Sequence, residues 1–221
     1  TEDTVENYVA SEVTGTYNIK NTYNPGKTSI TVHKVWSDGD NRDGKRPTGI
    51  EVELYKNGTA TGKKVTLDEN NHWKHTWTDL DEKANGQKIT YSVKETDETD
   101  GKVSFSGAEY TVTYSSEADG TLTVTNSHTP SVITIEGGKI WDDAGNEGAR
   151  PEKIIVRLKA NGEEVAHQEV TKDNGWKWKF ENFLEYKAGQ KIIYTVTEDT
   201  VENYVASEVT GTYNIKNTYN P

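Results

Sequence analysis

Short runs rich in Val, Ile, Thr and Tyr alternate with polar residues along the chain. This alternation is typical of β-strands that bury one face, because successive side chains of a strand point to opposite faces. Helical periodicity is hard to find, and turn signals separate the runs, at Asn57-Gly58, Asn85-Gly86, Asp119-Gly120 and Asn161-Gly162. About seven short strands in roughly ninety to a hundred residues predict a two-sheet sandwich, so we expect an all-β fold.

The chain repeats itself at two levels. The segment TEDTVENYVASEVTGTYNIKNTYNP forms residues 1–25 and recurs unchanged as residues 197–221. Weaker matches relate three further pairs of segments: 31–47 with 135–151, 84–95 with 187–198, and 122–130 with 213–221. We therefore predict the C-terminal strand segment of a preceding repeat at residues 1–25, a first module at 27–130 and a second module at 131–221.

Each module places three polar residues on apolar faces of predicted strands. Residues two apart share a face, so a lysine lies beside aliphatic and Trp residues in the first strand, a glutamate beside Tyr and Val, and an asparagine beside apolar residues in the last strand. These residues are Lys34, Glu95 and Asn126 in the first module, and Lys139, Glu198 and Asn217 in the second. Burial of such groups costs free energy unless they are paired or neutralised, so their recurrence requires an explanation.

Two explanations remain open on the residues alone. The first is a structural polar cluster, in which a buried Lys–Glu ion pair is completed by hydrogen bonds from Asn. The second is covalent chemistry, because desolvation lowers the pKa of a lysine and raises the pKa of a glutamate. A neutral amine could then attack the Asn side-chain carbonyl carbon while the acid polarises that carbonyl and transfers protons. Ammonia would leave, and a Lys–Asn amide would remain.

The motifs themselves resemble a known family. The pattern K-x-W-x-D…RP, then Y-[ST]-V-x-E, then [IV]-x-N-x…P, is similar to that of the Cna-B type modules of Gram-positive surface proteins. The paired arrangement most resembles the B-repeat regions of staphylococcal collagen adhesins, and the likeness extends from about residue 27 to residue 221. It implies tandem immunoglobulin-like (prealbumin-like) sandwiches with an isopeptide bond between first and last strands. The implied bonds are Lys34–Asn126, assisted by Glu95, and Lys139–Asn217, assisted by Glu198.

The resemblance also implies a function. It indicates a stalk or spacer of a cell-surface adhesin, extracellular and anchored to the cell wall, with neighbouring repeats of the same protein as partners. In such adhesins another region binds the host ligand, so we expect no host ligand to bind this chain. The fragment shows no signal peptide or sorting motif. Beyond a single self-crosslinking turnover in each module, we expect no enzyme activity and no cofactor.

Residues 1–25 contain the counterparts of two of the three polar residues. Glu2 and Asn21 correspond to Glu198 and Asn217, but no lysine strand precedes them. We expect this segment either to dangle or to replace residues 197–221 in a neighbouring chain. Such a strand exchange would bring Asn21 to the Lys139 of another molecule.

Composition and motif spacing argue against other classes of function. The formal net charge of -11 disfavours nucleic-acid and anionic-membrane partners. No apolar run is long enough to cross a bilayer, and the absence of Cys excludes disulfides. The acidic loop at 37–44 lacks the spacing of a calcium loop and is predicted as a polar turn. The five His are scattered rather than spaced as zinc ligands, so we expect no metal.

A carbohydrate-binding module is the alternative function. It would require an exposed aromatic platform, and two sets of aromatic residues fall on single strand faces: Trp73 with Trp77, and Trp176 with Trp178 and Phe180. Aromatic residues spaced by two in a sandwich usually face inward, so we expect these side chains to pack in the cores.

Overall fold

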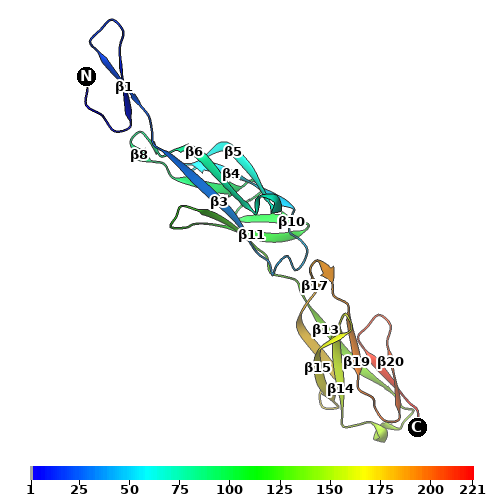
Figure 1. Cartoon of the computed structure of the whole chain (residues 1–221). Coiled ribbons are helices and arrows are strands. Elements are labelled where there is room, and N and C mark those ends of the chain that lie inside the picture. Colours follow the sequence, from blue (N-terminus) through cyan, green and yellow to red (C-terminus); the bar gives the residue numbers. More distant parts are fainter. Residues whose placement is uncertain (1) are drawn as a thin grey trace. The chain divides into compact units, whose positions relative to one another are not determined.

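The computed structural model describes residues 2–221, and its regular secondary structure is almost wholly β-strand (Figure 1). Among the described residues only two short 3-10 turns interrupt the strands, η1 (Glu69–Asn71) and η2 (Glu147–Ala149). The expected all-β fold is confirmed. The chain divides into two compact units, the first made of the residues up to Asp38 with Lys45–His128, and the second of Gly39–Gly44 with Thr129–Pro221.

The first unit is a sandwich of two sheets. One is five-stranded with the order β10-β11-β12-β3-β6, and the other is three-stranded with the order β5-β4-β9. The strands are β3 (Lys27–Ser37), β4 (Gly49–Lys56), β5 (Thr59–Asp68), β6 (Lys74–Asp81), β9 (Tyr91–Glu95), β10 (Lys102–Phe105), β11 (Ala108–Ser116) and β12 (Leu122–Ser127), with a small hairpin of β7 (Lys83–Ala84) and β8 (Gln87–Lys88). Their inward residues form one core, in which Val32 and Val124 of the first sheet and Val52 of the second are fully buried.

The second unit repeats this architecture with one strand fewer in its larger sheet. The sheets have the orders β16-β13-β21-β20 and β15-β14-β19. The strands are β13 (Val132–Asp142), β14 (Lys153–Ala160), β15 (Glu163–Thr171), β16 (Lys177–Leu184), β19 (Tyr194–Glu198), β20 (Tyr204–Glu208) and β21 (Ile215–Tyr219), with a small hairpin of β17 (Tyr186–Lys187) and β18 (Gln190–Lys191). Nothing in this unit corresponds to β10 of the first, so β20 is an edge strand.

In each unit the first strand and the last strand are parallel neighbours. Strand β12 pairs with β3 so that Val124 lies opposite Lys34 and Asn126 opposite Trp36. Strand β21 pairs with β13 in the same way, with Ile215 opposite Lys139 and Asn217 opposite Trp141. The chain therefore enters and leaves each sandwich on adjacent strands.

Residues near the N-terminus form a hairpin of β1 (Tyr8–Glu12) and β2 (Ile19–Tyr23). Its register, with Ala10 opposite Asn21, is the register of β20 and β21, in which Ala206 lies opposite Asn217. All residues of β1 and β2 are exposed, so the same sequence makes the same hairpin with or without a core to cover it.

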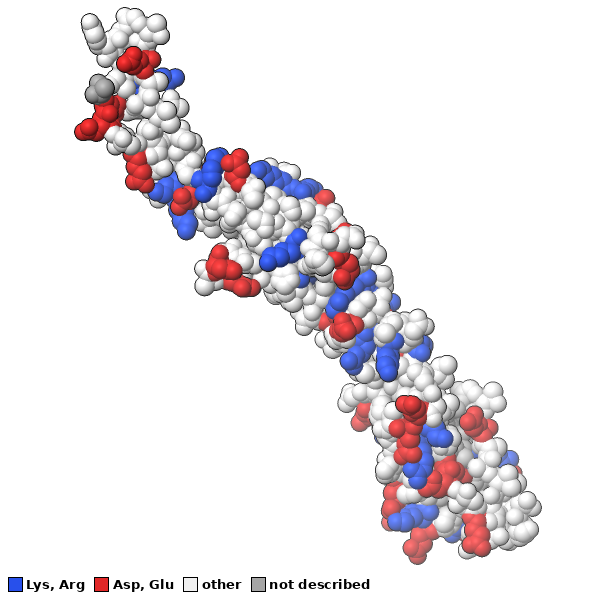
Figure 2. All heavy atoms as spheres, viewed as in Figure 1, with Lys and Arg blue, Asp and Glu red and all other residues white. Residues whose placement is uncertain are grey.

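The surface carries charges of both signs. Figure 2 shows acidic and basic side chains interspersed over the visible face of each unit. No helix among the described residues is long and apolar enough to cross a membrane. The aromatic residues predicted to pack inward do so, because Trp77, Trp176, Trp178 and Phe180 are buried and Trp73 packs against the core.

Candidate functional site

The three polar residues predicted for the first unit come from three different strands. Lys34 lies in β3 and Asn126 in the neighbouring β12, while Glu95 ends β9 of the opposite sheet, where it pairs with Val52. Strand alternation turns Lys34 and Asn126 to the same side as Val32 and Val124 of the core. Exposed fractions of 3% for Lys34, 3% for Glu95 and 0% for Asn126 confirm that all three are buried.

The hydrogen bonds in this first cluster join the acid to the amide. Asn126 Nδ2 donates to Glu95 Oε1 over 3.2 Å, and Lys34 Nζ donates to the backbone oxygen of Val35 over 3.0 Å. Glu95 Oε2 and Asn126 Oδ1 have no hydrogen-bond partner. If the Asn126 amide turned by half a rotation, a protonated Glu95 would donate to Oδ1, which is the contact needed to polarise the carbonyl.

Burial favours the neutral forms of both ionisable groups. Desolvation, opposed by the attraction of Glu95 and aided by the smaller repulsion of nearby Arg46, lowers the pKa of Lys34 to about 7. Desolvation likewise raises the pKa of Glu95. The pair is therefore placed where a free amine and a neutral acid can coexist near neutral pH.

The second cluster has the same members in a different hydrogen-bonding state. Lys139 Nζ donates to Glu198 Oε2 over 2.5 Å, with the two side chains 0% and 3% exposed. Desolvation lowers the pKa of Lys139 to about 8, and the bond to Glu198 opposes the change. Asn217 is fully buried, yet neither Oδ1 nor Nδ2 of its amide has a hydrogen-bond partner. In this unit the glutamate is hydrogen-bonded to the lysine, whereas in the first unit it is hydrogen-bonded to the asparagine.

A tryptophan contacts the lysine in both units. Lys34 Nζ lies 3.9 Å from the ring centroid of Trp36, and Lys139 Nζ lies 5.0 Å from that of Trp141. The Trp36 ring packs edge-on against Trp73 and Tyr110. Burial of the amine is the physical origin of the lowered lysine pKa in both units.

An arginine bound to a buried aspartate adjoins each of these tryptophans. Arg46 donates to both carboxylate oxygens of Asp38, over 2.7 and 2.6 Å, and its guanidinium carbon lies 5.5 Å from the Trp36 centroid. In the second unit Arg150 and Asp143 repeat the arrangement, at 2.5 and 3.2 Å. We did not assign a role to these residues from the sequence. The available signal was the recurrence of D…R-P after the K-x-W motif in both modules.

The N-terminal counterparts meet, but outside any core. Asn21 Nδ2 donates to Glu2 Oε1 over 2.7 Å. The hairpin holds no counterpart of Lys139, and both residues are exposed. The hairpin therefore preserves the acid–amide contact without the desolvation that the chemistry requires.

The remaining predicted features have structural explanations. In the acidic loop, Asp38 binds Arg46, and Asp43 Oδ2 accepts a hydrogen bond from the Ser131 backbone N–H over 2.8 Å. Within residues 2–221 no cluster of three or more His, Asp or Glu side chains could hold a metal ion. The inward packing of the tryptophans leaves the carbohydrate-binding alternative without the aromatic platform on which it depended.

Comparisons with known proteins agree with this architecture. The model of the Cna protein B-type domain family matches residues 30–127 and 135–218. A collagen adhesin of Staphylococcus aureus is 48% identical over 222 residues, which cover 100% of this chain and 18% of the adhesin. The crystal structure of two B repeat units (B1B2) of the collagen-binding protein of the same organism superimposes with a TM-score of 0.78 and 45% identity. That match covers 99% of this chain and 56% of the solved chain.

Proposed function

This chain belongs to the Cna protein B-type domain family, and we propose from that membership that it is a stalk or spacer region of a bacterial cell-surface adhesin. The proposal includes an extracellular, wall-anchored location and neighbouring repeats as partners. It also divides the chain into the C-terminal strand segment of a preceding repeat at residues 1–25 and two modules at 27–130 and 131–221. Because the chain corresponds to B repeats and spans only 18% of the related collagen adhesin, we assign any host-ligand binding to another region.

We further propose that each unit is closed by an isopeptide bond, Lys34–Asn126 in the first and Lys139–Asn217 in the second. One observation carries this proposal: both units bury a Lys of the first strand, an Asn of the last strand and a Glu of the facing sheet. A structural ion pair alone would not explain why the buried amide of Asn217 is left without partners. A buried amide without hydrogen bonds costs folding free energy, so its presence in the core requires another explanation.

The residues divide the chemistry among them. The neutral Nζ of Lys34 attacks Cγ of Asn126, while a protonated Glu95 donates to Oδ1 and stabilises the developing oxyanion. Glu95 then passes the proton released by the amine to the leaving nitrogen. The C–N bond of the amide breaks, ammonia leaves and an Nζ–Cγ amide remains. Lys139, Glu198 and Asn217 perform the same steps in the second unit, each site reacts once, and no cofactor takes part.

The bond would join the strands at which the chain enters and leaves each sandwich. Since β3 and β12 are adjacent, tension on the chain would pass through the covalent bridge and would not stretch the core between them. By the loop-entropy argument used for disulfides, closing a loop of this length would also stabilise the fold by about 4–5 kcal/mol. These are the properties that a spacer under load requires.

Single-molecule stretching tests the proposed function. With both bonds formed, pulling on the two ends should extend neither unit beyond its folded length. In Lys34→Ala the segment between the two crosslinking positions of the first unit is freed, which should add an unfolding step of roughly 300 Å from about ninety residues. Full unfolding extensions for both units of the unaltered chain would contradict the proposal.

A further inference from the structure

The catalytic acids proposed above are the last residues of edge strands. Glu198 is the last residue of β19, which is an edge strand paired only with β14, and Val156 lies opposite it. Glu95 likewise ends β9, which pairs only with β4. An edge strand frays most easily at its end, so other contacts must keep these two carboxyl groups in place.

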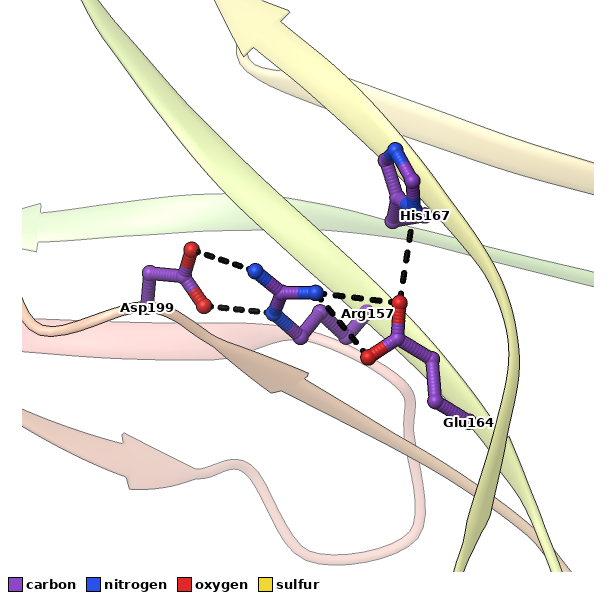
Figure 3. A network of polar contacts seen from close by, with 4 residues as sticks. All are labelled: Arg157, Glu164, His167 and Asp199. Atoms are coloured by element: carbon purple, nitrogen blue, oxygen red, sulfur yellow. Dashed lines mark hydrogen bonds and ion pairs between the residues drawn. The ribbon is translucent and has the colours of Figure 1, made fainter.

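In the second unit an arginine on the outer face of the sheet binds the residue that follows the end of β19. Arg157 of β14 donates to both oxygens of Asp199, over 2.6 and 2.8 Å, and Asp199 directly follows Glu198. The opposite edge of the guanidinium donates to both oxygens of Glu164 in β15, over 3.0 and 2.9 Å. Figure 3 shows Arg157 held between these two carboxylates, with His167 beside Glu164. The end of β19 is thus tied across β14 to β15.

The first unit has no counterpart of this clamp. The shared register places Glu53 where the second unit has Arg157, and Thr96 where it has Asp199. Instead, the backbone N–H of Glu95 donates to the hydroxyl oxygen of Tyr114 over 3.0 Å. That hydroxyl donates in turn to Glu98 Oε2 over 3.1 Å, so the phenol bridges the end of β9 and the loop that follows it.

The second unit in turn lacks the tyrosine. Val112 lies opposite Asn126 and Ala206 lies opposite Asn217, so Tyr114 corresponds to Glu208. Each unit therefore holds the end of its Glu-bearing strand, β9 or β19, by side-chain contacts that the other unit does not have. Two unrelated sequence solutions at one position indicate that the position itself has to be held.

These contacts lie at the surface, which bears on what they do. Arg157, Asp199 and Tyr114 are all partly exposed, and exposed ion pairs contribute little to folding stability. Placement of a catalytic group is a more sensitive quantity, because small displacements greatly slow a reaction between positioned groups. Contacts that contribute little to folding stability can therefore still change the rate of crosslinking.

We propose that Arg157 with Asp199 in the second unit, and Tyr114 with Glu98 in the first, are positioning residues for the crosslinking reaction. They hold the ends of β19 and β9 so that the carboxyl groups of Glu198 and Glu95 stay at the amides they activate. This inference rests on the proposed isopeptide chemistry. It assigns to each unit its own set of positioning residues, so the two units can be slowed independently.

Crosslinking rates in one molecule test the second-unit clamp. The full chain is made by cell-free synthesis, samples are quenched in acid at successive times, and peptide mapping by mass spectrometry follows each bond. Arg157→Gln should slow Lys139–Asn217 about five- to tenfold and leave Lys34–Asn126 unchanged. Lys159→Gln removes an equal charge from the same face of β14 and should have no effect.

A second variant separates positioning from a general effect of charge. Asp199→Asn should slow the second bond as Arg157→Gln does, and the two changes together should slow it no further, because they remove one contact. The pH at which the rate is half-maximal should stay at its original value in all three variants. A shifted midpoint would mean that Arg157 acts by charge on Lys139, which would overturn the proposal.

The converse test uses the tyrosine. Tyr114→Phe should slow only Lys34–Asn126, again about five- to tenfold, and Tyr55→Phe on neighbouring β4 should be silent. Unchanged rates in both Arg157→Gln and Tyr114→Phe, or equal slowing by the control variants, would overturn the inference while the crosslinks themselves still form. Absence of both bonds from the unaltered chain is a distinct result, which would overturn the inference together with the proposed function.

Discussion

At the scale of single residues, the buried amides are the atoms that most need an account. Asn217 has neither polar side-chain atom hydrogen-bonded, and Asn126 has its carbonyl oxygen free. Leaving a buried polar group unsatisfied costs about 1–3 kcal/mol. In the proposed chemistry these amides are reactants, and the free energy they cost is recovered when the covalent bond forms.

We expect the rate of each crosslink to rise from acid pH through the pKa of its lysine, because only the neutral amine attacks, and to fall once the glutamate has lost the proton it must donate. Desolvation lowers that pKa to about 7 for Lys34 and to about 8 for Lys139. Peptide mapping over time, at pH values below and above both pKa values, follows the rise of each bond. A rate that falls as pH rises from below both values would contradict the mechanism.

At the scale of elements, the sequence predicted which side chains face the core better than it predicted which strands pair. The period of a strand is fixed at two residues, so alternation alone turned Lys34, Glu95 and Asn126 inward. It could not predict which strands lie side by side, because the contact of β3 with β12 joins residues far apart in the chain. It also missed the Arg46–Asp38 pair, since charged residues in a polar loop carry no signal of burial. The different hydrogen-bonding states of the two clusters depend on side-chain rotamers, which residue patterns do not determine.

Strand β13 offers a test of close packing beside the second cluster. A Cβ on Gly137 would lie 2.5 Å from the Tyr213 backbone oxygen and 2.9 Å from ring carbons of buried Trp178. Gly137→Ala should therefore destabilise the second unit by about 1–3 kcal/mol, as overpacking does. Denaturant unfolding in a Lys34→Ala, Lys139→Ala background measures this without crosslinks. Gly148→Ala, whose Cβ meets nothing within 4 Å, is the control, and equal stabilities of the two variants would refute the packing argument.

At the scale of the whole molecule, one sequence occurs in two environments. Tyr8 is 45% exposed in the N-terminal hairpin, and the identical Tyr204 is 8% exposed in the second unit. Both hairpins have the same register and the same left-handed turn residue, Asn7 and Asn203, with φ of 62°. Local sequence therefore specifies the hairpin, and the surrounding sheet decides whether its apolar side is buried.

The N-terminal hairpin also allows a test of strand exchange, one of the two alternatives expected for residues 1–25. In Asn217→Ala the second unit loses its own amide, and Lys139 can be crosslinked only by Asn21 of another copy. We expect covalent oligomers of this variant on a denaturing gel, increasing with protein concentration. The double variant Asn21→Ala, Asn217→Ala should remain monomeric. A strictly monomeric Asn217→Ala chain at high concentration would rule out the exchange.

The intact mass of the denatured chain tests the central claim most directly. Two isopeptide bonds predict a mass lower than that of the sequence by two ammonia molecules. Glu95→Gln should restore one of them, because the substituted side chain cannot supply the proton, and tandem mass spectrometry should locate the remaining bond at Lys139 and Asn217. A mass equal to that of the sequence would contradict the account and leave the six buried residues as two structural polar clusters.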